Sequence, residues 1–194
     1  MTQAPRRKRD SAATKDALLQ AASALFAERG FNATTVRDVA ARAGVNQALL
    51  FRYFGSKQEL FAAVLSHNST RLLEAQPPEE LPLRILGNLL SADQLSGPEH
   101  PIAAMLRSYS DERAAHVLRE ELGARYAARL AELTDAPDAE LRADLVLAWL
   151  FGIGMVRSVL GKSPLADADP DAVARHVARG ISVLLERTDL PDEK

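Results

Sequence analysis

The 194-residue chain contains no cysteine, so it can form no disulfide, no thiolate metal site and no thiol nucleophile. It also lacks any run of about eighteen consecutive apolar residues, the length that a membrane-spanning helix needs. No apolar segment follows the basic N-terminus, so no secretory signal peptide is visible. We therefore expect a cytoplasmic protein with no membrane partner.

Histidine is also scarce, and its spacing does not suit a metal site. The four histidines are His67, His100, His116 and His176. No pair has the HExxH spacing that places two ligands on one helical face. Adjacent acids such as Glu120-Glu121 fit solvated helix faces better than paired catalytic carboxylates. We expect no metal, no cofactor and no catalytic residue, which argues against the alternative of a helical metal-dependent or acid-base enzyme.

Charge is distributed unevenly along the chain, although the net charge is only −2. Residues 1–65 hold ten Lys and Arg against five Asp and Glu, a net charge of +5, whereas the remainder carries −7. A basic N-terminal third on an acidic body is typical of a head that binds a polyanion and a body that does not. Chance clustering of charges on solvated faces is the alternative.

Apolar residues recur at helical spacing almost throughout, and no segment alternates as a strand does. The sequence therefore predicts an all-α fold of about nine helices. The predicted helices span about 11–29, 36–43, 47–54, 56–76, 81–95, 101–110, 111–133, 138–162 and 170–187. Segments rich in Pro, Gly and Asp separate them.

Start and stop residues place the N-terminal helices. The segment Thr35-Val36-Arg37-Asp38 has the form of a capping box, and so does Ser56-Lys57-Gln58-Glu59. Asn46 is a good N-cap for the helix between them, and Gly44 fits the turn before it. Small Ala40 allows the two short helices to approach closely. This pattern predicts a helix-turn-helix whose second helix presents its outer face to the DNA major groove.

At these residues the chain resembles the TetR (tetracycline repressor) family. The resemblance covers about residues 14–65 and is specific, because several motifs occur in order. They are Leu25-Phe26-Ala27-Glu28-Arg29-Gly30-Phe31, Ala33 to Ala40, Ala43-Gly44-Val45 and Leu50 to Leu60. The rest of the chain resembles the family only in the number and lengths of its helices.

The resemblance implies that the head binds double-stranded operator DNA. It implies that Thr35 and Lys57, at helix N-termini, hold backbone phosphates, which also agrees with the positive dipole end of a helix. It implies that base edges are met by Arg37, Asn46, Gln47, Ala48 and Leu49. Gln47 suits adenine and Arg37 suits guanine, whereas Ala48 and Leu49 suit a thymine methyl. The alternatives are that Thr35 acts only as a helix cap and that Arg37 is only a solvated charge.

One position departs from the family. Phe51 stands where the family often has a Tyr whose hydroxyl donates to a phosphate, so that hydrogen bond cannot form here. We expect Arg52 to supply a charged phosphate contact instead, and we expect Tyr53 and Phe54 to be half-buried anchors of the helix. Arg6 to Arg9 resemble a basic arm that follows the minor groove or the phosphates, with a disordered solubilising tail as the alternative.

These features predict three regions: a basic disordered arm over 1–10, a DNA-binding domain over 11–56, and an effector-binding and dimerisation domain over 57–194. A dimer is expected because one helix-turn-helix reads only a few base pairs. The helix over 145–160 is apolar almost all round, so it needs cover on two sides. With the last helix it predicts an interface of Leu147, Leu150, Phe151, Gly154, Val173, Val177, Ile181 and Leu184.

A cavity for a small-molecule effector, largely apolar, is expected among the four predicted helices between residues 81 and 162. Its predicted walls are Leu86, Leu90, Met105, Tyr109, His116, Tyr126 and Trp149. An ordinary filled core is the alternative for each of these residues. The overall prediction is a repressor released from a palindromic operator by that effector, with an activator or an effector-independent regulator as alternatives.

Overall fold

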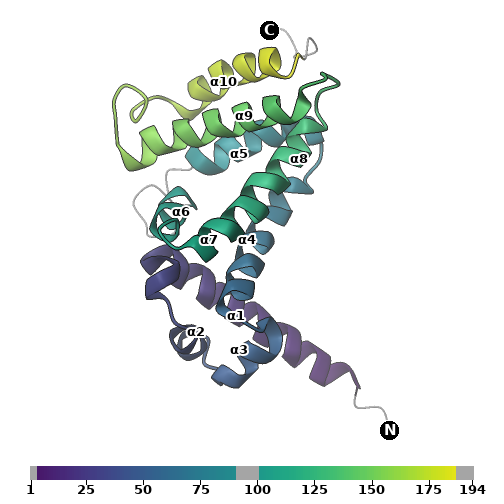
Figure 1. The fold of residues 1–194 in the computed structure, drawn as a ribbon, viewed down its shortest axis with the longest axis vertical. Helices are drawn as coiled ribbons and strands as arrows, with labels where there is room; N and C mark the ends of the chain where they lie inside the picture. The colour runs from purple at the N-terminus through teal and green to yellow at the C-terminus, as the bar shows by residue number, and fades with distance from the viewer. Residues whose placement is uncertain (1–3, 91–100, 187–194) are drawn as a thin grey trace.

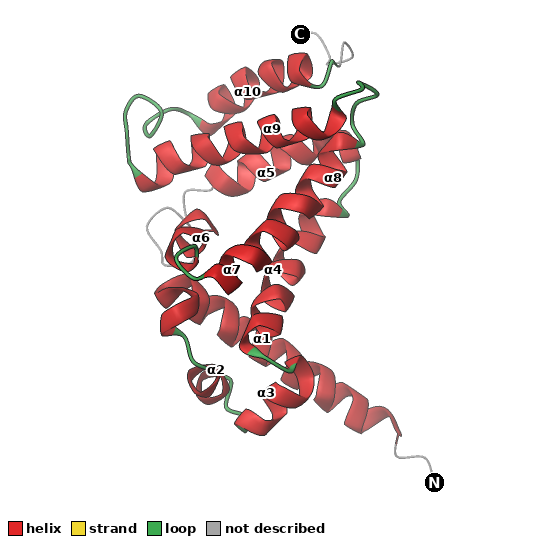
Figure 2. Ribbon diagram, viewed as in Figure 1, coloured by secondary structure: helices red, strands yellow, loops and turns green. Residues whose placement is uncertain are grey.

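The computed structural model describes residues 4–90 and 101–186, and every element in these two ranges is helical (Figures 1 and 2). The elements are α1 Ala4–Ala33, α2 Val36–Arg42, α3 Gln47–Phe54, α4 Lys57–Leu73, η1 Pro78–Glu80, α5 Leu81–Leu90, α6 Pro101–Ser108, α7 Glu112–Leu118, η3 Arg119–Ala124, α8 Arg125–Ala131, α9 Ala139–Gly154, η4 Met155–Val159 and α10 Pro170–Leu184. The π-helical segment η3 joins α7 to α8, and η4 extends α9. Counted as continuous helices, the described residues form nine, so the predicted all-α fold is confirmed.

Helix α1 differs from its predicted start. It begins at Ala4 rather than near Ser11, so the backbone of residues 4–10 is helical and not the disordered arm that we expected. Alanine, arginine and lysine are good helix formers, and a proline is tolerated in a first turn, so the basic segment extends the helix. Residues 1–3 of the predicted arm lie outside the described residues.

The other helix ends follow their capping residues closely. Thr35, Asn46 and Ser56 are the N-caps of α2, α3 and α4, and each side chain accepts a backbone N–H of the first turn. The predicted helix over 81–95 is seen as α5, and its residues 91–95 lie outside the described part. Residue 187, at the predicted end of α10, lies outside it as well.

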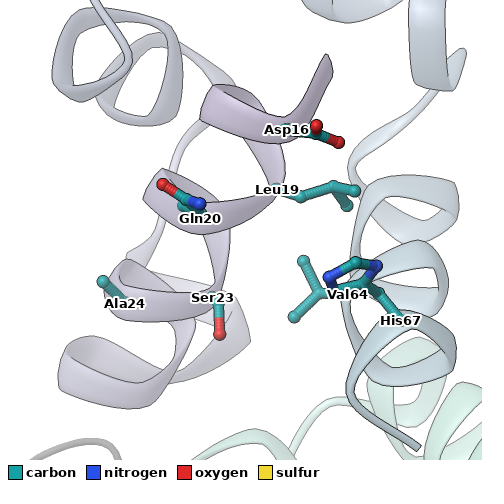
Figure 3. A pocket seen from close by; sticks show the side chains of 7 residues that line it. All are labelled: Asp16, Leu19, Gln20, Ser23, Ala24, Val64 and His67. Carbon is teal, nitrogen blue, oxygen red and sulfur yellow. The ribbon is translucent and has the colours of Figure 1, made fainter. Parts of the chain in front are cut away.

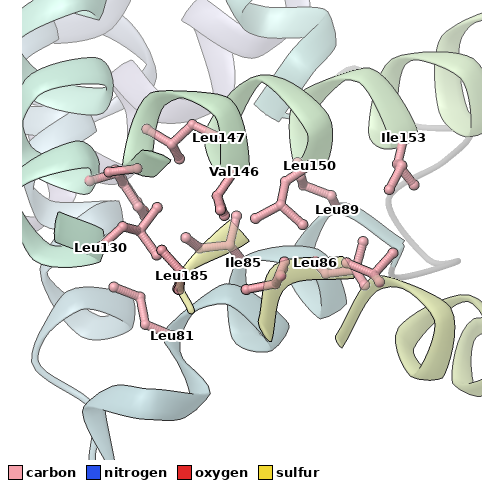
Figure 4. Packing of buried hydrophobic residues seen from close by; sticks show 14 of the residues in the cluster. Leu81, Ile85, Leu86, Leu89, Leu130, Val146, Leu147, Leu150, Ile153 and Leu185 are labelled. Carbon is pink, nitrogen blue, oxygen red and sulfur yellow. The ribbon is translucent and has the colours of Figure 1, made fainter. Parts of the chain in front are cut away.

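Two apolar cores divide the molecule. One core packs α1, α2 and α3 against the first half of α4 and against Ala114 and Leu118 of α7. The other packs α5, α8, α9 and α10 (Figure 4). Helix α4 therefore contributes to both, through Leu60, Phe61 and Val64 in the first core and Leu73 in the second. The head that carries α2 and α3 thus shares its apolar core with α4, and this core does not end at residue 56.

Figure 1 shows the resulting arrangement. Helices α9 and α10 lie at one end of the molecule, α2 and α3 lie at the other, and α4 and the α7–α8 helix run between them. Among residues 4–90 and 101–186, no helix combines the length and the apolar character that crossing a membrane requires.

Candidate nucleic-acid interface and effector cavity

Helix α3 has one buried and one exposed face. Leu50 and Phe54 are buried in the head, whereas Gln47, Ala48, Phe51 and Arg52 are exposed. The exposed set follows the spacing i, i+1, i+4 and i+5, so these side chains form one continuous stripe. The stripe combines an amide, a small apolar group, an aromatic ring and a guanidinium, and no acidic residue occurs in α3.

The turn between α2 and α3 holds this stripe outward. Gly44 adopts a φ of +67°, which only glycine accepts without strain, and the Val45 amide donates to the Ala40 carbonyl at 3.0 Å. Arg42 of α2 forms an ion pair with Glu28 of α1 at 2.7 Å. The observed turn therefore agrees with the predicted roles of Gly44 in the turn and of Ala40 where the two helices approach closely.

Asn46 and Leu49 are less available than Gln47. The Asn46 side-chain Oδ1 accepts the Ala48 amide at 2.8 Å, so only its NH₂ group remains to meet a base. Leu49 is half-buried, whereas Arg37 on α2 is exposed. Of the predicted base-contacting residues, all but Leu49 are thus exposed, and Asn46 has one of its polar groups occupied within the chain.

Thr35 and Asp38 form the capping box that the sequence predicts. The Thr35 amide donates to the Asp38 carboxylate at 3.1 Å, and the Asp38 amide donates to the Thr35 hydroxyl at 3.1 Å. The Thr35 hydroxyl also donates to the same carboxylate at 2.7 Å, and these bonds hold the pKa of Asp38 below its ordinary value. Thr35 is exposed at the head surface, but its hydroxyl already has protein partners.

Lys57 lies where α1, α2 and α4 meet. Its Nζ donates to the Phe31 carbonyl at 2.9 Å and to the Thr34 carbonyl at 3.1 Å, and it stands 4.1 Å from the centre of the Phe31 ring. Partial burial lowers the pKa of Lys57. The structure therefore gives Lys57 a packing role that the sequence did not reveal, with one ammonium N–H left for another acceptor.

The aromatic residues at the end of α3 anchor it to α1. The Tyr53 hydroxyl is 2.9 Å from the Ser11 hydroxyl, and Lys15 Nζ lies 5.8 Å from the centre of the Phe54 ring. Tyr53 is half-buried as predicted, Phe54 is buried rather than half-buried because it packs into the core of the head, and Phe51 is 46% exposed. Ser11 and Lys15 lie in the part of α1 that the sequence also predicts to be helical, so these contacts do not depend on the earlier start of the helix.

A second set of contacts joins the head to the body, and no local sequence pattern predicts it because the partners are far apart in the chain. The Phe31 amide donates to the Ser108 hydroxyl at 3.1 Å, and Arg107 donates to the Ala27 carbonyl at 2.7 Å. At Gly30 (φ +75°, ψ 176°) α1 is kinked, and an added Cβ would lie 2.8 Å from the Arg107 carbonyl oxygen. The end of α1 is therefore docked tightly against the end of α6.

A cavity of about 130 Å³ lies at this boundary. Its walls come from α1, α4, α5, α6, α7, α8 and η3: Ser23, Phe26, Ala27, Phe61, Val64, Leu65, Ser69, Leu72, Asn88, Met105, Leu118, Leu122 and Tyr126. Head and body residues thus line the same space. Of the predicted effector-binding residues, Met105 and Tyr126 are among these walls.

The other predicted effector residues lie elsewhere. Leu86 and Leu90 are buried in the core between α5, α9 and α10. Tyr109 and His116 are exposed, and Trp149 lies on an exposed face of α9, where its ring covers Gly180 of α10. These five assignments are wrong for this cavity, because residue type alone does not indicate which side of a helix faces the space.

A more open groove of about 410 Å³ lies between α1 and α4 (Figure 3). Its lining is more polar and includes Asp16, Gln20 and His67. Ser23 and Val64 line both the groove and the cavity. The contact between α1 and α4 therefore borders both the groove and the cavity.

The predicted dimer interface is also corrected. Leu147, Leu150, Gly154, Val173, Val177 and Ile181 are buried within the chain itself, and Phe151 and Leu184 are half-buried against the same core (Figure 4). Because α9 is apolar nearly all round, its sequence does not tell which stripe faces inward. The exposed apolar face is formed instead by Leu141, Leu145 and Trp149 of α9, with Val183 of α10.

No group of three His, Asp or Glu side chains within residues 4–90 and 101–186 is placed to hold a metal ion. His100 lies outside these ranges.

The fold and the exposed stripe of α3 define a helix-turn-helix DNA-binding protein with a helical body. Comparison with known proteins identifies its family. Residues 18–64 match "Bacterial regulatory proteins, tetR family", and residues 79–185 match "Tetracyclin repressor-like, C-terminal domain". The chain belongs to the TetR family and is a DNA-binding transcriptional regulator, as the sequence motifs predicted. Regulators of this family are not enzymes.

Relatives extend the likeness over most of the chain. The HTH-type transcriptional repressor Rv3405c of Mycobacterium tuberculosis is 35% identical over 182 residues, which covers 82% of this chain and 86% of the relative. A TetR-family regulator of Streptomyces coelicolor A3 is 33% identical, with a TM-score of 0.53 over 90% of this chain and 96% of that one. The fatty acid degradation regulator FadR of Bacillus halodurans shares the fold, with a TM-score of 0.65 at 19% identity over 91% of this chain and 99% of that one.

Proposed function

We propose that the protein is a homodimeric repressor that binds a near-palindromic operator and is released when a small molecule occupies the cavity between head and body. The observation that carries the proposal is the stripe of Gln47, Ala48, Phe51 and Arg52, exposed on one face of α3 while its other face is buried. The relative Rv3405c is named a repressor, which supports the sign of regulation proposed here.

Base recognition follows from the side chains on that stripe. The Gln47 amide suits the N6 and N7 atoms of adenine, and Ala48 and Phe51 offer apolar surface to a thymine methyl. Exposed Arg37 of α2 and the NH₂ group of Asn46 are assigned to base edges as well, and half-buried Leu49 offers a partly accessible apolar side chain. Arg52, Thr35 and Lys57 are assigned to phosphates, where Lys57 has one N–H to offer after its two carbonyl bonds.

Dimerisation is assigned to the exposed face of α9 and α10. Leu145 is 47% exposed, Leu141 59% and Val183 75%, and Trp149 packs over Gly180 beside them. Large apolar side chains exposed together on neighbouring helices favour a surface that another protein covers. A second copy that covers it would bring two α3 helices onto one face of the duplex, about 34 Å apart for adjacent turns.

Release follows from the shared walls of the cavity. Phe26 and Ala27 belong to the α1 end that docks on α6, and Met105 and Tyr126 belong to the body. A ligand that binds better when these helices are displaced shifts the population away from the head position that fits DNA, by no more than its difference in affinity for the two states.

Two experiments test the proposal. Enrichment of duplexes from a randomised pool by the full-length protein is expected to yield an inverted repeat, and a pool with no repeated half-site contradicts dimeric recognition. A transcription assay from the enriched site is expected to show less transcript when the protein is added. More transcript would indicate an activator, and the repressor assignment would then be wrong.

A further inference from the structure

The size of the cavity restricts what it can hold. Pockets for drug-sized ligands occupy roughly 300–1,000 Å³, whereas an engineered apolar cavity of roughly 150 Å³ binds benzene. The cavity between head and body measures about 130 Å³. It therefore matches a molecule of about one six-membered ring.

The walls also restrict the charge of the ligand. Phe26, Phe61, Met105 and Leu122 are apolar, and the polar residues of the wall are neutral. A carboxylate or ammonium moved into this space would lose its hydration without meeting an opposite charge in the wall, and the Arg125 guanidinium beside Ser69 is already paired with Glu121. The chemistry of the walls thus favours an uncharged occupant.

Among the polar wall residues without a hydrogen-bond partner in the described residues, Tyr126 is the most buried. Tyr126 is only 7% exposed, and its hydroxyl forms no hydrogen bond within residues 4–90 and 101–186. Burial raises the pKa of Tyr126 to about 12, so the phenol is neutral and can donate a proton. The hydroxyl keeps some accessible surface, because the fully enclosed side-chain polar atoms without a partner in the described residues are Arg84 Nε and Arg157 Nε. An acceptor in the cavity can therefore reach this donor and bond to it.

Asn88 and Ser23 add further polar capacity. Both line the cavity, and neither side chain bonds to another group in the described part of the chain. Ser69, by contrast, already donates to the Ser66 carbonyl at 3.2 Å. The unused polar groups are therefore few, and they face a largely apolar space.

We propose that the cavity binds an uncharged molecule of about one-ring size whose single oxygen accepts a hydrogen bond from the Tyr126 hydroxyl. Small phenols, cyclic ketones and ring alcohols belong to this class. The inference rests on the proposed function for its regulatory meaning, because occupancy of this cavity is what releases the DNA. Binding itself needs no DNA.

Isothermal titration calorimetry of the full-length protein without DNA tests the class. The probes are phenol and cyclohexanone. Benzoate is the charged control compound, and 2-naphthol is the two-ring control compound. We expect phenol and cyclohexanone to bind at one site per chain, and benzoate and 2-naphthol to bind at least tenfold more weakly. Equal or tighter binding of benzoate or naphthol, or no binding by any probe, overturns the proposal.

Variants locate the site. Tyr126→Phe removes only the hydroxyl and is expected to weaken phenol about tenfold, the value of one neutral hydrogen bond. Tyr109→Phe, at a 64% exposed tyrosine outside the cavity, is the matched control and is expected to change nothing. Leu122→Phe is expected to fill the space and abolish binding, with thermal melting showing that the variant is folded.

Two results separate this inference from the proposed function. Phenol binding that survives Leu122→Phe but is lost in His67→Ala would place the ligand in the open groove and overturn the cavity assignment. Phenol binding with the expected variant pattern, in a protein that selects no DNA duplex, would support the cavity inference and contradict the proposed function.

Discussion

At the scale of single residues, burial and existing partners decide which side chains of the head can meet DNA. Gln47 and Arg52 project from α3, whereas the Thr35 hydroxyl is bonded within its capping box. The sequence predicted the caps because their spacing is local. It did not predict the bonds of Lys57, because the Phe31 and Thr34 carbonyls reach Lys57 only through the folding of α1 against α4.

Replacement of Gln47 by Ala is expected to relax base preference at one position of each half-site, by about 1–3 kcal/mol. The reason is the loss of a bidentate amide contact while the remaining stripe is kept. Enrichment of a randomised duplex pool measures the change, with Gln20→Ala, exposed on α1, as the control. An unchanged base profile at every position would remove Gln47 from the readout.

Replacement of Lys57 by Met is expected to lower the free energy of unfolding by about 1–3 kcal/mol, because two charge-assisted hydrogen bonds and a cation–π contact are lost. It is also expected to weaken all duplex sequences about equally. Urea titration and anisotropy measure the two effects, with exposed Lys162→Met as the control. Weakened DNA binding at unchanged stability would assign Lys57 to phosphate contact alone.

At the scale of elements, local signals predicted helix starts better than helix faces. Thr35, Asn46 and Ser56 placed α2, α3 and α4, because a cap depends on residues within one turn. The sequence predicted that Leu147 and Leu150 of α9 face a second subunit, but they face the core of their own chain. Apolar residues surround this helix, so only its packing on α5 and α10 selects the inner face. The start of α1 was placed too late, although its first residues are good helix formers.

The close packing of α1 against α6 predicts that a side chain added at Gly30 destabilises the protein. Gly30→Ala is expected to cost about 3 kcal/mol or more in stability, because its φ and ψ suit only glycine and the new Cβ would meet Arg107 at 2.8–2.9 Å. Gly44→Ala, at a φ of +67° with nothing within 4 Å, is the matched control and is expected to cost about 1–2 kcal/mol. Chemical denaturation measures both, and equal losses would show that the docking of α1 on Arg107 adds nothing.

At the scale of the whole molecule, the sites lie between elements that are distant in sequence. Phe26 and Tyr126 line one cavity although a hundred residues of chain separate them in the sequence. Motifs predicted the helix-turn-helix because it is continuous in sequence. The cavity walls depend on non-local packing, so of the predicted wall residues only Met105 and Tyr126 lie there.

The exposed face of α9 predicts which substitution should disrupt the dimer. Leu145→Glu is expected to shift the protein from dimer to monomer in sedimentation velocity, because a charge would be buried in an apolar interface. Operator affinity is expected to fall with it, since one head alone retains only half of the contacts. Leu106→Glu, on an exposed position of α6, is the control and is expected to remain dimeric. A dimer that survives Leu145→Glu would move the interface to another surface.

The measurement that tests the central claim most directly is the affinity of the full-length protein for its enriched duplex and for a scrambled duplex at several salt concentrations. If α3 enters the major groove beside phosphate-binding head residues, affinity for the enriched duplex should exceed that for the scrambled one by about 10³-fold or more. Both affinities should fall steeply with salt, by about 0.9 in log–log slope for each phosphate neutralised. Equal affinities for the two duplexes, or binding that salt does not change, would contradict the assignment of α3 as the helix that reads DNA.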